Sequence, residues 1–186
     1  MAYQLKVINP VEELTLTDRQ SYRQRAINAG LTRAVEKKVA PSQDELVVRH
    51  AQCNADFGTT AVLDFWATPV MAAPLGTLVT VFQAIAAPVL AATKVAVFYK
   101  VTIGTAPIPV SLIAFREGAA AGTTKAVYDL EQLDGYLIPS GYFSEPVVYD
   151  PQQVLNVVVA TRIVTGLLCR CILGCYIIEP KGAIIS

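Results

Sequence analysis

The run Lys94-Val95-Ala96-Val97-Phe98-Tyr99-Lys100-Val101-Thr102-Ile103 carries the clearest structural pattern in this 186-residue sequence. Successive side chains of a β-strand point to opposite faces, so every second residue shares a face. One face would carry Val95, Val97, Tyr99, Val101 and Ile103. Lys94, Lys100 and Thr102 would lie on the other face. This alternation is typical of a strand in a sheet that covers a core on one side.

Eight further segments are rich in β-branched and aromatic residues, which favour strands. They lie near residues 45–52, 60–67, 77–86, 109–116, 124–129, 146–150, 153–161 and 166–179. Turn residues such as Asp134-Gly135 and Pro139-Ser140-Gly141 separate them. Because helices do not alternate with these strands, the sequence predicts an all-β fold. We expect a jelly-roll-like β-sandwich of about eight strands, whose strand order the sequence leaves open.

A short helix is predicted ahead of the strands, over residues of about 17–30. Thr17 can cap its N-terminus, Gln20 completes a capping box three residues later, and Gly30 marks the expected end. The spacing of Leu31, Val35 and Val39 allows either an extension of this helix or an arm packed on another surface.

The predicted domain boundary follows Pro41-Ser42. We therefore expect an N-terminal arm over residues 1–44 and a β-sandwich domain over residues 45–186. Such a short helix has too little apolar surface to fold alone. Either it packs on the flank of its own domain, or the arm extends and docks on a neighbouring subunit.

The composition is unusually apolar: 53% of residues are hydrophobic, 16% are charged, and the mean hydropathy is +0.44. The 15 basic and 15 acidic side chains balance, which argues against direct nucleic-acid binding by phosphate neutralisation. Residues 1–38 hold seven basic and four acidic side chains, whereas residues 39–186 hold eight and eleven. Sparse charge on an ordered chain indicates surface that is covered by another protein.

Neither long uncharged stretch suits a membrane-spanning helix. Residues 65–93 are interrupted by Pro69, Pro74 and Pro88, and residues 154–178 contain Arg162 and Arg170. The first six residues lack the apolar region of a secretory signal. We expect no membrane span and no secretory signal, and a chain that is made and kept in a cytoplasm.

The thiols and the single histidine do not form a recognisable metal or catalytic motif. Cys169, Cys171 and Cys175 have even spacing, which puts them on one strand face as small buried residues rather than around a tetrahedral ion. His50 lies three residues from Cys53, on the opposite strand face, and a structural or surface role is expected for it. The sequence predicts no metal, no cofactor and no enzymatic activity.

The acidic residues Asp129, Glu131 and Asp134 leave an alternative open. Together with Tyr136 they could contact calcium or a sugar in a lectin-like module. The other interpretation is a solvated strand edge, where charge prevents edge-to-edge aggregation.

Several side chains are candidates for an interface with another subunit. Tyr142 and Phe143 lie in a predicted loop, where aromatic rings either anchor a partner or plug the core. Ile184 and Ile185 near the C-terminus would be poorly placed in water. The predicted arm adds Arg19, Tyr22, Arg23, Arg25, Lys37 and Lys38, whose cations would face an acidic partner surface.

Three segments resemble the single jelly-roll proteins of virus particles, especially phage capsid and capsid-decoration (cement) proteins. They are Phe115-Arg116-Glu117-Gly118, Tyr128-Asp129-Leu130-Glu131-Gln132-Leu133 and residues 141–149 (Gly141-Tyr142-Phe143-Ser144-Glu145-Pro146-Val147-Val148-Tyr149). The resemblance implies a structural virion protein that forms a homo-oligomer, with a trimer expected, on a lattice of major capsid protein. It implies no catalytic residue.

Overall fold

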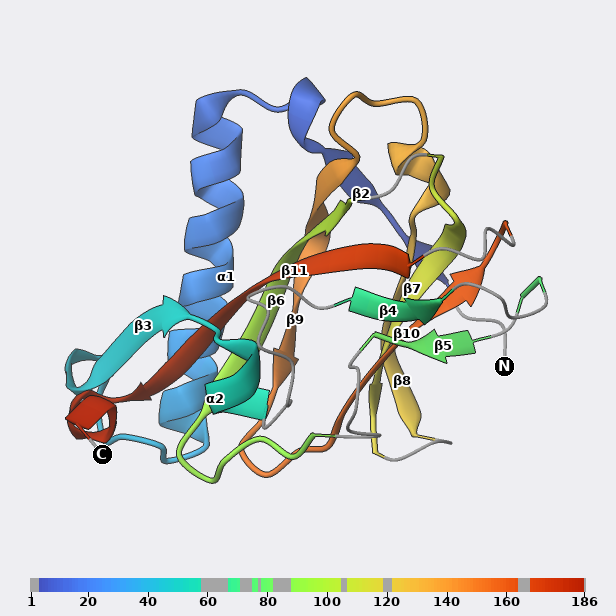
Figure 1. The fold of residues 1–186 in the computed structure, drawn as a ribbon. Helices are drawn as coiled ribbons and strands as arrows, with labels where there is room; N and C mark the ends of the chain where they lie inside the picture. Colours follow the sequence, from blue (N-terminus) through green and yellow to red (C-terminus); the bar gives the residue numbers. More distant parts are fainter. Residues whose placement is uncertain are drawn as a thin grey trace.

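The computed structural model describes residues 4–57, 67–70, 75–76, 78–81, 88–104, 107–118, 122–163 and 168–185. Two β-sheets pack face to face, and one long helix lies along the outside of one of them (Figure 1). The five-stranded sheet has the order β1 (Leu5–Lys6), β8 (Thr123–Asp129), β7 (Val110–Glu117), β10 (Leu155–Thr161) and β5 (Leu78–Thr80). The six-stranded sheet has the order β2 (Ile8–Pro10), β9 (Ser140–Tyr149), β6 (Val95–Ile103), β11 (Leu168–Pro180) and β3 (Leu46–His50), with β4 (Ala67–Val70) also paired to β11.

The strand order is that of a jelly roll. Along the chain, β3 lies in the six-stranded sheet, β5 in the other, and β6 in the first again. The β7–β8 hairpin then stays in the five-stranded sheet, and β9, β10 and β11 alternate between the two. Four strands of each sheet therefore follow the orders β3-β11-β6-β9 and β5-β10-β7-β8, the paired Greek keys of a jelly roll. The predicted fold class is confirmed.

Strand β6 differs from its predicted one-sided pattern. Val97 and Tyr99 point away from the sandwich core, whereas Val101 and Ile103 point into it. The pairing with β9 shifts register between Phe98 and Lys100, and this irregularity moves the apolar positions to the other face. Both faces of β6 are apolar because both are covered.

The helix is longer than predicted and begins earlier. Helix α1 spans Leu16–Glu36, and Thr15 rather than Thr17 is its N-cap, in a capping box with Asp18 rather than Gln20. Gly30 does not end the helix: it is buried in its middle, where a Cβ atom would lie 2.4 Å from Ile178 Cδ1. Glycine is needed there for close packing on the sheet.

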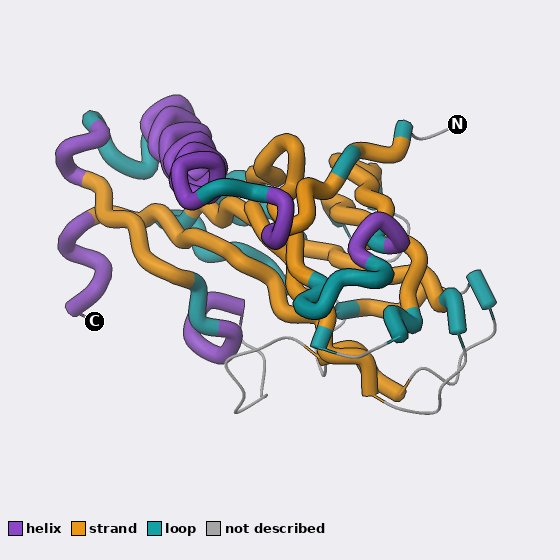
Figure 2. Tube along the Cα trace, turned by 90° about the horizontal axis from the view of Figure 1, so that it is seen from above, coloured by secondary structure: helices purple, strands orange, loops and turns teal. Residues whose placement is uncertain are grey.

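Helix α1 packs on its own domain, which was one of the two arrangements left open. Figure 2 shows it lying along the outside of the strands. Its buried residues Ala26 and Ala34 join a second apolar cluster with Val97, Tyr142 and Ile178. β1 and β2 pair with β8 and β9, so the described residues before 45 supply two strands and a covering helix.

Strand β9 begins earlier than predicted, because residues 141–145 belong to it instead of forming a loop. Gly141 pairs with Pro10 of β2, and a Cβ on Gly141 would lie 2.2 Å from Ile8 Cγ2. The glycine that resembles a turn signal in the sequence here lets two strands approach closely.

Five short helical segments complete the described structure. They are η1 (Val11–Glu13), η2 (Gln43–Glu45), α2 (Cys53–Phe57), η3 (Glu131–Leu133) and η4 (Lys181–Ile185). The predicted strand at 60–67 lies outside the described residues, except for Ala67. Of the strand predicted at 77–86, only β5 and Val81 are described. The core between the sheets is aromatic at its centre, where the rings of Phe98 and Phe115 lie 5.3 Å apart.

Candidate assembly surfaces

The helix–sheet junction gathers several of the predicted interface residues within one chain. The ring of Tyr22 stacks on that of Tyr142, with centroids 5.5 Å apart. Arg23 Nε donates to the Tyr142 hydroxyl at 3.2 Å. Arg25 lies 5.0 Å over the Tyr22 ring and donates to the Ser144 carbonyl at 3.4 Å. These contacts tie α1 to β9, and any interface role of the three helix residues remains a prediction.

The remaining cations of the predicted arm have different surroundings. Arg19 Nη2 donates to the Val11 carbonyl at 2.6 Å, and Lys37 Nζ lies 3.1 Å from the Asp150 carboxylate. Lys38 is exposed just after the helix, with a positive φ of 58°. Lys38 is thus available to a partner.

The predicted loop position of Tyr142 and Phe143 is wrong. Both lie in β9 and are 1% exposed. Phe143 packs its ring 4.4 Å from that of Tyr128 in the core. Of the two roles considered, partner anchor and core plug, the structure places both rings in the core. Ile184 and Ile185 fall in η4, but their side chains lie outside the described residues.

The acidic residues that could have bound calcium or sugar are held by an arginine. Arg162 Nη1 lies 2.6 Å from an Asp134 oxygen, and its Nε lies 3.8 Å from Glu131. Asp129 accepts a hydrogen bond from the Glu131 backbone N–H at 2.9 Å. Tyr136 donates to Glu13 on η1. Across the described residues no three potential metal ligands come together.

The histidine and the described cysteines occupy separate places. His50 is exposed, with its ring 4.9 Å from that of Tyr176. Cys169, Cys171 and Cys175 are buried thiols, as small apolar residues would be. Burial, followed by the neighbouring Cys169, raises the pKa of the Cys171 thiol. The side chain of Cys53 lies outside the described residues.

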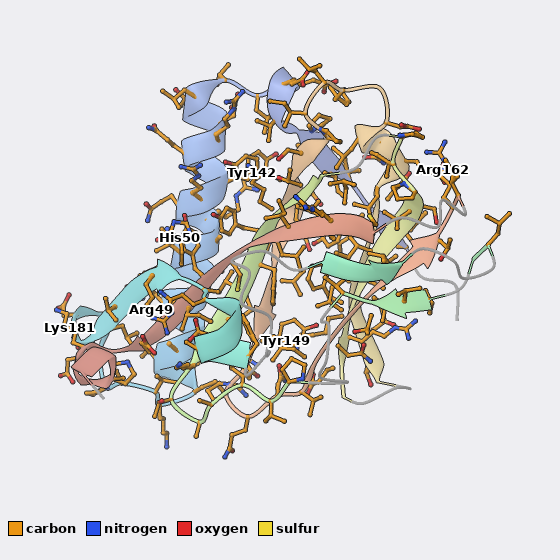
Figure 3. All side chains as sticks on the ribbon, viewed as in Figure 1. Arg49, His50, Tyr142, Tyr149, Arg162 and Lys181 are labelled. Atoms are coloured by element: carbon orange, nitrogen blue, oxygen red, sulfur yellow. The ribbon has the colours of Figure 1, made fainter. Side chains whose placement is uncertain are left out.

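A largely buried ion network joins three elements and Lys94, just before β6, at the end of the molecule near η4 (Figure 3). Arg49 donates both Nη atoms to Asp56 at 2.7 and 2.6 Å, and its Nε to Glu179 at 2.6 Å. Lys94 lies 2.8 Å from Asp56 and 3.7 Å from Glu179. The charges of the two cations and the two anions therefore balance. These four side chains leave no unpaired charge in the adjoining hollow of about 450 Å³. The network holds α2, β3 and β11 together.

The outer surface of the five-stranded sheet is apolar. We call outer face the group formed by Leu5, Leu78, Leu112, Ala114, Val127 and Val158. Leu5 and Leu78 are exposed and Leu112 is half-buried, whereas Ala114, Val127 and Val158 are buried beneath them. A shallow groove of about 270 Å³ runs between the leucines, with Arg116 and Thr124 at its rim. Among the described elements, the long helix covers the other sheet and none lies over this one (Figures 1 and 2).

A second apolar surface projects from the loop before β9. Leu137 is 91% exposed and Ile138 57%. The loop is held in place, because the Ile138 N–H donates to Glu12 at 2.8 Å and Asp134 pairs with Arg162. We call these two residues the apolar tip. A rigid exposed pair of large aliphatic side chains is typical of an interaction site.

Comparison with known proteins identifies a similar fold only. No protein-family model matches the sequence, and no curated protein matches it. The VP2 subviral particle of infectious bursal disease virus is similar in structure, with a TM-score of 0.41 and 12% identity. The match covers 75% of this chain and 34% of that one. The structure of the infectious bursal disease virus Gx strain gives a TM-score of 0.39 and 11% identity over the same shares, so this chain spans about a third of the length of either matched chain.

Sequence reasoning found neither the outer face nor the apolar tip. For the outer face a signal exists: β7 reads Leu112-Ile113-Ala114-Phe115, apolar at consecutive positions, which indicates a strand covered on both sides. The tip residues stand between Gly135 and Pro139 and read as an ordinary turn. No helix in the described structure has the length and apolar character needed to cross a bilayer.

Proposed function

We propose that this chain is a structural subunit of a virus particle, which associates with copies of itself and with a major capsid protein. The observation that supports this most directly is the apolar outer face on a jelly-roll framework. Soluble monomers rarely leave such a face open, because water contact with large aliphatic side chains is unfavourable. Jelly rolls occur in capsid, lectin and cupin domains, so the surface rather than the fold supports the role.

The occupant we propose for the outer face is the apolar tip of a neighbouring copy. The exposed aliphatic side chains of Leu137 and Ile138 would fill the groove that lies between Leu5, Leu78 and Leu112.

The two surfaces differ, so a contact between them is heterologous. A heterologous contact that closes generates a ring, and the trimer expected from the sequence is the smallest such ring beyond a pair. In the finer form of the proposal, the chain is a capsid-decoration (cement) protein or a minor capsid subunit, located in the virion.

The lectin-like alternative has less support. Its candidate residues Glu131 and Asp134 are paired with Arg162, which occupies the oxygen atoms that an ion or sugar would need. No other observation favours this second function.

Analytical ultracentrifugation of the purified chain tests the assembly contact. We expect the wild type to form trimers at micromolar concentration. Leu137→Glu in the tip and Leu112→Glu in the groove should each give monomers, because a carboxylate would be buried in an apolar contact. Leu16→Glu is the matched control, since Leu16 is also a large exposed aliphatic but lies at the start of α1.

A wild-type chain that stays monomeric, or a trimer that Leu137→Glu leaves intact, would contradict the contact. The virion role is tested separately by mass spectrometry of purified particles of the virus that encodes the chain. Its absence from those particles would contradict the virion role, whatever the oligomeric state.

A further inference from the structure

Three cations gather at the junction between the N-terminal half of α1 and the six-stranded sheet. Arg23 Nε donates to the Tyr142 hydroxyl, and Lys100 Nζ lies 5.8 Å from the centroid of the same ring. Arg19 lies one helical turn before Arg23, on the same side of α1. We call Arg19, Arg23 and Lys100 the cation cluster.

No carboxylate neutralises the cation cluster. In the described part of the chain, ion pairs hold Lys6, Arg33, Lys37, Arg49, Lys94, Lys125 and Arg162, but none of the three cluster residues. Arg19 Nε is buried and has no hydrogen-bond partner. Lys100 makes a ring contact instead of an ion pair.

The acidic residues near the cluster in the sequence are engaged elsewhere. Asp18, the one acid of α1 before Glu36, accepts hydrogen bonds from Thr15 in the capping box. Glu12 and Glu13 on η1 bind the loop before β9. The cluster therefore has an unbalanced positive charge in the folded chain.

The charge of Lys100 shows the consequence of this imbalance. Lys100 is half-buried, and burial lowers its pKa, with Arg23 and then Arg19 lowering it further. Like charges held together in a partly buried site disfavour the charged form. An anion bound beside Lys100 would offset its repulsion by Arg23 and Arg19.

A groove runs beside the cluster at Arg23. It has a volume of about 550 Å³ and is lined by Thr17, Gln20, Ser21, Arg23, Gln24, Ile27 and Tyr176, so that Arg23 is the member of the cation cluster that borders it. Hydroxyl and amide groups can donate hydrogen bonds to oxygen atoms. The groove begins in the first turns of α1, where the helix dipole also favours negative charge.

We propose that the cation cluster and this groove bind a phosphate group. Guanidinium and ammonium groups donate to phosphate oxygens from several directions, and Arg23 is exposed and anchored to the Tyr142 hydroxyl through its Nε. A phosphate carries close to two negative charges at neutral pH, which would offset most of the charge of three cations.

The phosphate is expected to be free or a small monoester. Three cations on a chain of zero net charge do not form the extended positive surface that a nucleic-acid backbone needs. The inference is independent of the virion role, because it depends on the charges at the junction alone.

Thermal unfolding of the full chain tests the site, with sodium phosphate compared against sodium chloride of equal ionic strength. For the wild type we expect a saturable rise of the unfolding midpoint with phosphate, since a ligand of the folded state stabilises it. Arg23→Gln and Lys100→Met should weaken phosphate binding by about tenfold or more, the loss expected for one charge-assisted hydrogen bond. Lys38→Gln removes an exposed cation elsewhere and should bind phosphate as the wild type does.

A second readout separates binding from a structural role. Without phosphate, Lys100→Met should raise the unfolding midpoint, because it removes a repelled charge. If Lys100→Met does not fold, Arg23→Gln decides the test, since Arg23 is an exposed helix residue.

Adenosine monophosphate forms the second arm of the experiment. Equal binding of adenosine monophosphate and inorganic phosphate indicates a site for any phosphate, and tighter binding of the monoester indicates an esterified ligand. No phosphate-specific stabilisation, or equal stabilisation of Arg23→Gln and Lys38→Gln, would overturn the proposal.

Discussion

Gly30 of α1 lies directly against Ile178 of β11. A Cβ atom at Gly30 would be 2.4 Å from Ile178 Cδ1 and 2.7 Å from Val97 Cγ2. In a free helix, replacing glycine by alanine stabilises by about 1 kcal/mol. Here we expect Gly30→Ala to destabilise the chain by about 1–3 kcal/mol, the usual cost of overpacking a core. Urea unfolding followed by circular dichroism measures the change.

Thr32→Ala supplies the comparison for this substitution. Thr32 is exposed on the same helix, so alanine there should leave the stability unchanged or raise it slightly through helix propensity. A Gly30→Ala variant that is as stable as Thr32→Ala would mean that α1 can move off the sheet without cost.

The sequence predicted the fold better than the helix that covers it. Alternation and turn residues located most strands of both sheets within a few residues, because strand periodicity depends on local contrast between the two faces. The predictions at Gly30 and Gly141 were wrong for the same reason. Each looks like an end or a turn in sequence, yet each is required where two backbones approach, and that approach is a tertiary property.

The candidate surfaces were harder to predict for a similar reason. Arg49 and Glu179 are 130 residues apart in the sequence, and Arg33 and Asp150 are 117 residues apart. No short-range sequence pattern therefore predicts either ion pair. The cations of α1 were visible as an excess of positive charge. Which of these cations lack a carboxylate partner could be learned only from the structure, because ion pairing depends on the strand order.

Asp150 predicts an acid-sensitive helix–sheet contact. Its carboxylate accepts from Arg33 Nε and Nη2 at 2.6 and 2.7 Å, and these bonds, with Lys37, outweigh burial and hold its pKa below the ordinary value of 3.8. A carboxyl with a lowered folded-state pKa stabilises the fold above its unfolded pKa, and that stability is lost as pH falls through the folded value. We therefore expect the unfolding free energy to fall below about pH 4.

The measurement is urea unfolding at several pH values, with Asp150→Asn as the comparison. The variant should be less stable at pH 7 and should show a shallower decrease between pH 4 and pH 2, because one titrating carboxyl is gone. Parallel pH profiles for the two chains would show that Asp150 does not carry the effect.

The ion network around Asp56 predicts strong coupling between charges. Arg49 and Lys94 both contact the fully buried Asp56 carboxylate. Asp56→Asn should cost about 3–5 kcal/mol, because it leaves two cations facing one carboxylate, Glu179. Adding Lys94→Met restores the charge balance and should recover part of that loss. A double-mutant cycle by urea unfolding measures the recovery, and strictly additive losses would contradict the coupling.

The buried thiols predict a chemical signature of the intact sandwich. Cys169, Cys171 and Cys175 are buried thiols in the core, and burial raises the pKa of Cys171, so the reactive thiolate is scarce there. In a Cys53→Ala background, Ellman's reagent should detect no fast thiol in native buffer and all three in denaturant. Rapid labelling in native buffer would mean that β11 opens locally from its neighbours β6 and β3. Since β11 pairs with β6 from Cys171 to Ile178 and with β3 from Tyr176 to Pro180, such opening would break the six-stranded sheet, and we expect labelling to occur at the rate of global unfolding.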